Sequence, residues 1–237
     1  MDAKGLCVPI VVTVLITVMS QLGVSAGEPM KIVAFGDSTT AARGALVVYA
    51  KLLQDELPTR GVPVEVVNAG VGGHSTEAAR ARLEKDVLGR SPVLVIIQFG
   101  INDSAIDVWK GATTARVPMS RYEENLRHFV QTLKARKAQV ILMTPNPMTW
   151  TDTLKKMYGK PPYDPEDPDG FNLLLKDYAA VVRKIAQDES LPLVDVYRLF
   201  KDYGNVSDLL LDGMHPNEKG HRLIADALLK QIQAGGR

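Results

Sequence analysis

The sequence predicts an α/β fold in which a five-stranded parallel β-sheet is covered by helices on both faces, giving three layers. Short apolar runs alternate with longer segments of helical periodicity from residue 31 to near the end of the chain. Such alternation is typical of parallel strands joined by right-handed crossover helices. The third short run, 92–99 (PVLVIIQF), is apolar at almost every position, as a strand covered on both faces must be.

Each predicted element follows from a local pattern. The short apolar runs predict strands over 31–35, 63–68, 92–99, 139–144 and 193–196. Helical spacing of apolar residues predicts helices over 45–57, 75–88, 120–133, 173–188 and from about 216 to 232. Ser120 and Glu123 have the spacing of a capping box at the start of the third helix. Residues 145–170 are rich in Pro, Asp, Lys and Thr and are predicted to form a long loop, a feature that is usually functional or mobile.

The first 26 residues differ in composition from the rest. Only Asp2 and Lys4 are charged, residues 6–19 carry no charge, and the segment ends Val24-Ser25-Ala26. This pattern is typical of a cleaved secretory signal peptide, so we expect a single exported domain over 27–237, either periplasmic or extracellular. The alternative is an uncleaved membrane anchor, because residues 6–24 are nearly long enough to span a bilayer. A lipoprotein is not expected, since its cysteine would follow the apolar stretch, whereas Cys7 lies at the beginning of it.

Composition excludes several classes of partner. The 28 basic and 27 acidic residues give a net charge of +1, so no nucleic-acid partner is expected. The single cysteine, Cys7, lies in the predicted signal peptide, which leaves no disulfide, cysteine nucleophile or cysteine metal site in the mature chain. The chain has no P-loop sequence and no histidine pair at metal spacing. Residues 70–75 resemble a dinucleotide fingerprint, but Ser75 stands at the third glycine position.

Four segments predicted at one edge of the sheet carry side chains suited to acyl transfer. Ser38 follows the first strand, a glycine-rich loop at 70–73 follows the second, Asn102 follows the third, and Asp212 and His215 precede the last helix. Ligands bind at the carboxyl ends of parallel strands. A serine nucleophile needs a base such as histidine, and a carboxylate three residues away can orient that base. The Ser38 amide, a glycine amide and the Asn102 side chain could stabilise an oxyanion.

These segments resemble the four sequence blocks of the SGNH (GDSL-like) hydrolase family, which is named for a Ser, a Gly, an Asn and a His. Gly36–Thr39 matches the first block, with Thr39 in place of leucine, Gly100–Asp103 matches G-x-N-D, and Asp212–His215 matches D-x-x-H. The N-x-x-x-x-G pattern of the second block starts at Asn68 and ends at Gly73, with Gly70 and Gly72 as alternatives for the oxyanion glycine. The resemblance covers about 31–232. It implies a flavodoxin-like sheet and no metal or organic cofactor.

The expected function is that of an exported serine esterase. Its catalytic residues would be Ser38, Asp212 and His215, with an oxyanion hole formed by Ser38, Gly73 and Asn102. The polar composition of 145–170 favours small acyl esters, acetyl esters in particular, of hydrophilic alcohols such as carbohydrates. The alternatives are a lysophospholipase or thioesterase acting on longer acyl chains, and a non-catalytic carbohydrate-binding module of the same fold.

Several other polar and aromatic residues have two interpretations. Asp37 and Asp103 are expected to bind loop amides rather than to act in catalysis. His74, Trp109 and Trp150 are candidate substrate contacts, since loops at this edge would wall the site; the alternatives are a surface turn for the histidine and loop anchoring for the tryptophans. His128 and His221 are expected on the surface. The sequence does not predict an oligomeric state.

Overall fold

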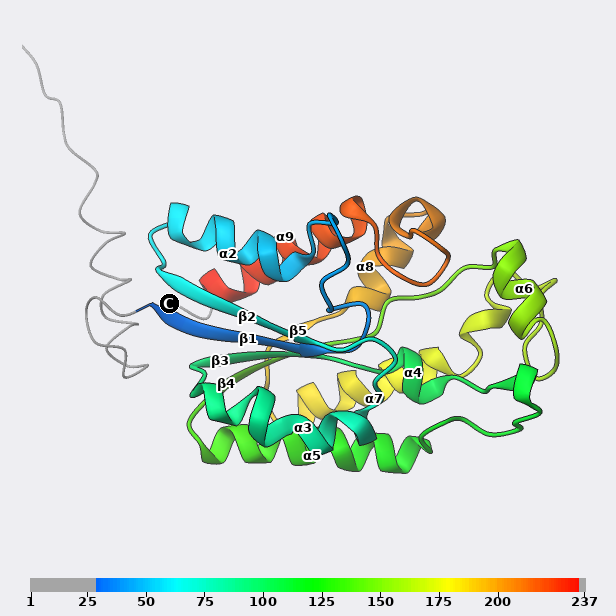
Figure 1. The fold of residues 1–237 in the computed structure, drawn as a ribbon, viewed down its shortest axis with the longest axis horizontal. Helices are drawn as coiled ribbons and strands as arrows, with labels where there is room; N and C mark the ends of the chain where they lie inside the picture. The colour runs from blue at the N-terminus through cyan, green and yellow to red at the C-terminus, as the bar shows by residue number, and fades with distance from the viewer. Residues whose placement is uncertain (1–28, 235–237) are drawn as a thin grey trace, which may run out of the picture.

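Five parallel strands form one sheet in the computed structural model, which describes residues 29–234 (Figure 1). The strands lie in the order β2–β1–β3–β4–β5, and every neighbouring pair is parallel. They span Met30–Gly36 (β1), Val64–Gly70 (β2), Leu94–Gln98 (β3), Gln139–Met143 (β4) and Leu193–Val194 (β5). This is the flavodoxin-like order, in which the strand sequence reverses between β1 and β3. The predicted fold class is therefore confirmed.

Helices cover both faces of the sheet (Figure 1). One face carries α2 (Tyr49–Thr59), α8 (Val196–Asp202) and α9 (Glu218–Ala234), and the other carries α3 (Thr76–Asp86), α5 (Met119–Ala135) and α7 (Leu175–Asp188). Two short helices, α4 (Ile101–Ser104) and α6 (Asp152–Tyr158), lie beyond the carboxyl ends of the strands. The remaining turns are 3-10 helices at Leu88–Arg90 (η1), Val108–Lys110 (η2), Gly170–Asn172 (η3) and Val206–Leu209 (η4).

The alternation of β1 places one apolar core on each side of the sheet. Ile32 and Ala34 pack with side chains from α2 and α9, whereas Val33 and Phe35 pack with side chains from α3 and α5. On the second side, the ring of Phe35 meets those of Phe99 and Phe129 edge-on, with centroids 5.2 and 5.6 Å apart. Edge-to-face contacts of this kind are a favoured geometry for aromatic pairs. Both cores hold β1 rigidly beneath the residues that follow it.

All five predicted helices begin one to four residues away from the predicted start, and two of these differences have a clear local cause. The helix expected over 45–57 begins at Tyr49, because Gly44 adopts a left-handed φ of +54° and Arg43 and Leu46 pair as an isolated bridge. The capping box expected at Ser120 is wrong. The helix begins one residue earlier, at Met119, after Pro118, which makes no side-chain cap. Ser120 is therefore already inside the helix, where its hydroxyl no longer occupies the capping position.

The segment expected as a long loop, 145–170, is more ordered than its composition indicates. It contains α6, and its apolar side chains Leu154, Tyr158 and Tyr163 are buried in a third cluster with Phe171. Residues of α4 and α7 complete this cluster. The charged residues of the segment thus lie around an apolar interior. Segment 145–170 is a small packed unit next to the carboxyl edge of the sheet.

The N-terminal prediction concerns residues outside the described range, since the predicted signal peptide covers 1–26 and the structure describes 29–234. Within those described residues, no helix combines the length and the apolar character needed to cross a bilayer.

His221 is buried, contrary to the expectation that it lies on the surface. It is 2% exposed because α9 packs along α2, and its Nδ1 accepts a hydrogen bond from the backbone N–H of Tyr49 (3.3 Å). Burial lowers the pKa of His221 from 6.5 to about 4, with a smaller effect from the positive charge of Arg43. The imidazole is therefore neutral in the folded protein over most of the acidic range.

This burial predicts a loss of stability in mild acid. Between pH 6.5 and 4 the unfolded chain takes up a proton on His221 while the folded protein does not, so the free energy of unfolding falls as the pH falls. The pKa difference corresponds to about 3 kcal/mol. In urea unfolding across this range, His221→Gln should show a shallower pH dependence than the wild type. His128→Gln is the comparison variant: burial and the charge of Arg80 lower the pKa of His128 as well, but this residue is only partly buried, so its removal should change the pH dependence less than His221→Gln does. Equal pH dependence in all three proteins would contradict the assignment.

Candidate active site

A hydroxyl, an imidazole and a carboxylate form a hydrogen-bonded chain at the carboxyl edge of the sheet. Ser38 lies two residues after β1, and its Oγ is 2.9 Å from Nε2 of His215. Nδ1 of the same ring is 2.8 Å from Oδ2 of Asp212. Because a carboxylate only accepts hydrogen bonds, Nδ1 carries the proton and Nε2 is left to accept the hydrogen of Ser38. The imidazole is thus aligned to take a proton from the serine.

The Asp212 carboxylate is fixed by the turn that carries it. Its Oδ1 accepts hydrogen bonds from the backbone N–H groups of Met214 (3.1 Å) and His215 (2.9 Å). Partial burial works against the charged form, but these bonds and the His215 ring hold the pKa of Asp212 below its ordinary value. The group that faces Nδ1 is therefore a carboxylate at neutral pH.

The loop after β4 holds the turn that carries Asp212 and His215. Asn146 Nδ2 donates to the carbonyl of Met214 (2.9 Å), and the Thr149 N–H donates to the carbonyl of Gly213 (2.8 Å). Gly213 has a φ of +84°, and a Cβ at this position would lie 2.5 Å from the Thr149 oxygen. No sequence motif indicated these contacts. The position of Asn146, just after the fourth predicted strand, could have indicated that it lies at the same edge of the sheet as Ser38.

The segment around Ser38 is held by side chains on both sides of it. Asp37, which is 1% exposed, accepts hydrogen bonds from the backbone N–H and the hydroxyl of Thr39, both at 2.8 Å. Burial raises the pKa of Asp37 despite these bonds. Asn68, near the end of β2, donates to the carbonyl of Thr40 (2.8 Å). Asp37 therefore binds a loop amide, as expected, and Ser38 projects from a fixed turn.

The predicted oxyanion donors come from the two neighbouring strands. Gly72 and Gly73 follow β2, and a Cβ built on Gly72 would lie 4.0 Å from Cβ of Ser38. Gly73 has a left-handed φ of +77°, with no atom within 4 Å of where a Cβ would stand. Asn102, in the first turn of α4, donates through Nδ2 to the carbonyl of His74 (3.2 Å). Asn102 thus lies against the glycine loop, which lies against Ser38.

Arg82 connects the first two strand ends, and sequence reasoning missed it. Its guanidinium donates to the carbonyls of Gly36 (2.8 Å, Nη2) and Ala69 (2.7 Å, Nη1) and to Nδ1 of His74 (3.2 Å, Nε). It also lies 4.6 Å above the ring of Phe35. Arg82 lies on α3, seven residues after its N-cap Ser75, on the face that turns towards the strand ends. These contacts fix the glycine loop relative to the serine turn.

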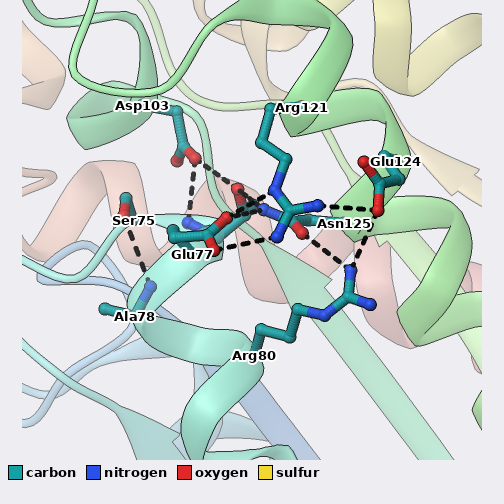
Figure 2. A network of polar contacts seen from close by, with 9 residues as sticks. Ser75, Glu77, Ala78, Arg80, Asp103, Arg121, Glu124 and Asn125 are labelled. Carbon is teal, nitrogen blue, oxygen red and sulfur yellow. Dashed lines mark hydrogen bonds and ion pairs between the residues drawn. The ribbon is translucent and has the colours of Figure 1, made fainter.

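A buried polar network supports the α4 turn from below (Figure 2). Asp103 is 0% exposed and accepts a hydrogen bond from the Thr76 N–H (2.8 Å) at the start of α3. Asn125 on α5 donates to the Thr76 hydroxyl (3.2 Å) and accepts from Arg80 (3.0 Å). Burial raises the pKa of Asp103 to about 7. Asp103 therefore binds an amide, as expected, and joins α4 to α3 and α5.

The three candidate substrate contacts have different surroundings. His74 is partly buried, and burial together with Arg82 lowers its pKa. The Trp150 ring stacks on Phe171 (4.5 Å between centroids), and its N–H reaches the carbonyls of Asp164 (3.2 Å) and Asp167 (3.1 Å), contacts that fit the loop-anchoring alternative. Trp109 is 48% exposed in η2. Substrate contact by these residues stays a prediction.

A serine, a histidine and an aspartate linked in this order define the arrangement of serine hydrolases. Among residues 29–234, no group of three or more His, Cys, Asp and Glu side chains is placed to hold a metal ion. The family model described as the GDSL-like lipase/acylhydrolase family matches residues 34–223. The chain belongs to this family, and it is a carboxylic ester hydrolase.

The chain also resembles individual proteins of known sequence and structure. It is 31% identical over 217 residues to the uncharacterized lipoprotein YqeF of Bacillus subtilis, covering 83% of this chain and 87% of the relative. It is 29% identical over 197 residues to an acetylxylan esterase of Geobacillus stearothermophilus, covering 80% of each. The crystal structure of Axe2, an acetylxylan esterase from that species, superposes with a TM-score of 0.67 at 26% identity, covering 87% of this chain and 95% of that one. Thioesterase 1/protease 1/lysophospholipase L1 of Escherichia coli is 26% identical over 200 residues, covering 84% and 81%.

The anchored turn at Gly213 gives a testable prediction. A side chain in Gly213→Ala meets the Thr149 carbonyl and displaces His215, and a misplacement of about 1 Å can cost about 10²-fold in rate. Esterase kinetics should show a fall in kcat of that order. Gly61→Ala is the matched control, because Gly61 has a φ of +81° with no atom within 4 Å of its Cβ position. Equal activity in the two variants would contradict the role of this turn.

Proposed function

We propose that this protein is an exported serine esterase that removes small acyl groups, acetyl groups in particular, from hydrophilic alcohols such as O-acetylated carbohydrates. The observation that carries the proposal is the chain of contacts from Ser38 Oγ to His215 (2.9 Å) and from His215 to Asp212 (2.8 Å). The likeness to an acetylxylan esterase supports the acetyl preference. Export rests on the composition of residues 1–26.

In the proposed acylation, Ser38 Oγ attacks the ester carbonyl carbon while His215 Nε2 takes the hydroxyl proton. Asp212 stabilises the imidazolium that forms. The carbonyl oxygen becomes an oxyanion that accepts hydrogen bonds from the Ser38 and Gly73 amides and from Asn102 Nδ2. When the tetrahedral intermediate collapses, the carbon–oxygen bond to the alcohol breaks and His215 gives its proton to the leaving alcohol.

Deacylation reverses these roles with water in place of the alcohol. His215 Nε2 takes a proton from water, whose oxygen attacks the acyl carbon of the ester on Ser38. The same donors stabilise the second oxyanion. Collapse breaks the bond to Ser38 Oγ, which takes back the proton from His215. The products are the free carboxylic acid and the original enzyme.

The surroundings of the site favour a polar alcohol over a long acyl chain. An open groove of about 490 Å³ adjoins Asn102 through Arg116, and its lining mixes the charged side chains Arg116, Arg121 and Glu77 with Ala78, Val117 and Pro118. The exposed large apolar side chains are spread along the chain, at Val47, Trp109, Met119, Met157, Leu173, Tyr203 and Leu211. A second candidate function is a lysophospholipase or thioesterase, favoured by the likeness to the Escherichia coli enzyme of that name.

Removal of the nucleophile should abolish turnover. We expect Ser38→Ala to lower kcat for a small acetyl ester by at least about 10⁴-fold, since the hydroxyl forms the acyl-enzyme. Ser104→Ala is the control, because the Ser104 hydroxyl donates only to the Ile101 carbonyl within α4; its activity should stay within about threefold. Unchanged turnover in Ser38→Ala would refute the assignment.

Acyl length separates the two candidate functions. Across p-nitrophenyl esters from acetyl to palmitoyl, kcat/KM should be highest for acetyl and fall with each extension, because a long acyl chain in the adjoining groove would lie against the charged side chains Arg116, Arg121 and Glu77. Acetylated xylo-oligosaccharides should release acetate. A maximum at eight carbons or more would favour the lysophospholipase or thioesterase function instead.

A further inference from the structure

Arg116 binds the side-chain oxygen of Asn102, and no sequence motif indicated it. It lies in the segment between α4 and α5, and its Nη1 donates to Asn102 Oδ1 (3.0 Å). Its own N–H donates to the carbonyl of Ala105 (2.9 Å), which holds the backbone of Arg116 next to the end of α4. The guanidinium therefore reaches the proposed oxyanion donor from the side of the groove.

The contacts of Asn102 determine which way its carboxamide faces. Oδ1 accepts from Arg116, and Nδ2 gives one of its two hydrogens to the carbonyl of His74 (3.2 Å). A guanidinium has donors only and a carbonyl oxygen only accepts. A flipped amide would set donor against donor at Arg116 and acceptor against acceptor at His74. In the observed orientation, Nδ2 is the donor that faces the glycine loop, and a hydrogen bond from Asn102 also favours the charged form of Asp37. In the proposed mechanism, its second hydrogen is donated to the oxyanion.

A carboxylate holds Arg116 in place. Asp107 Oδ1 accepts from both Nη2 (2.6 Å) and Nε (3.1 Å) of Arg116, so one charged oxygen holds two N–H groups on the same side of the guanidinium. These bonds lower the pKa of Asp107 despite its partial burial. Asp107 also pairs with Lys110 (3.3 Å), so this one carboxylate faces two cations. A positive charge thus remains behind Asn102.

We propose that Arg116, held by Asp107, is a positioning residue that fixes and polarises the Asn102 carboxamide for the oxyanion. This inference rests on the proposed function, because Arg116 acts through Asn102. A fixed donor costs no reorganisation as charge develops, and a neighbouring cation strengthens the N–H groups of the amide. Arg116 is therefore expected to raise kcat only in a protein that retains Asn102.

A double-mutant cycle on the full chain tests this dependence. We expect Asn102→Ala to lower kcat by about 10²–10³-fold, the usual loss for one oxyanion donor. Arg116→Met should lower kcat by about 10-fold or more with KM changed less than about threefold, because the donor is misdirected rather than removed. In the Asn102→Ala background, Arg116→Met should change kcat by less than about threefold.

Two results would overturn the inference. Equal losses from Arg116→Met in both backgrounds would mean that Arg116 acts independently of Asn102. A rise in KM with unchanged kcat would make Arg116 a substrate-binding residue of the groove. Arg127→Met is the matched control, since Arg127 is also a partly exposed arginine paired with carboxylates, Glu123 and Asp188. Its kinetics should equal those of the wild type.

Asp107→Asn provides a second variant that retains Arg116 and the charge behind Asn102. It should lower kcat in the same direction, by less than Arg116→Met, and have no further effect in the Asn102→Ala background. The melting temperature of each variant shows whether a loss of kcat comes from misfolding or from a misplaced Asn102 in a folded protein. If the proposed oxyanion role of Asn102 is wrong, Asn102→Ala itself leaves kcat unchanged. If only the inference about Arg116 is wrong, Asn102→Ala lowers kcat, but Arg116→Met lowers kcat by the same factor in both backgrounds.

Discussion

The hydrogen bond between Ser38 Oγ and His215 Nε2 joins residues 177 positions apart, and the rest of the site depends on it. Parallel strands make this contact possible, because they deliver their carboxyl ends to one edge (Figure 1). The apolar cores on both faces of β1 fix the position of Ser38. The turn before α9 fixes His215, and the loop after β4 holds that turn through Asn146 and Thr149.

Below this edge, polar side chains replace the apolar packing of the sheet. Asp37 and Asp103 are almost fully buried, and each accepts hydrogen bonds from the backbone N–H and the hydroxyl of a threonine, Thr39 and Thr76 respectively. Burial raises the pKa of both, so the fold carries an electrostatic cost at this edge. Arg82 and Arg116 supply positive charge next to the glycine loop and to Asn102. In the proposed mechanism, this positive charge and the donors at the edge stabilise the negative charge that develops on the oxyanion.

Periodicity was enough to predict the sheet, its five strands and the order of the main helices, because the core positions alternate or repeat along the chain. The residues that follow strands, Ser38 and Asn102 among them, could be placed at one edge for the same reason. Contacts that depend on side-chain packing could not be predicted from the sequence. Nothing local in the sequence shows that Arg116 reaches Asn102 or that His221 lies beneath α2. The helix start at Met119 was missed because the proline before it competes with the capping pattern at Ser120.

In the proposed mechanism, His215 activates Ser38 as a nucleophile, and this activation can be measured directly. A fluorophosphonate probe reacts with activated serines, and mass spectrometry of the labelled protein locates the modified residue. We expect a single label on Ser38 in the wild-type protein and a labelling rate lower by orders of magnitude in His215→Ala, whose fold should persist because His215 is partly exposed and lies outside the apolar cores. A label on another residue, or undiminished labelling of Ser38 in His215→Ala, would contradict the proposed mechanism.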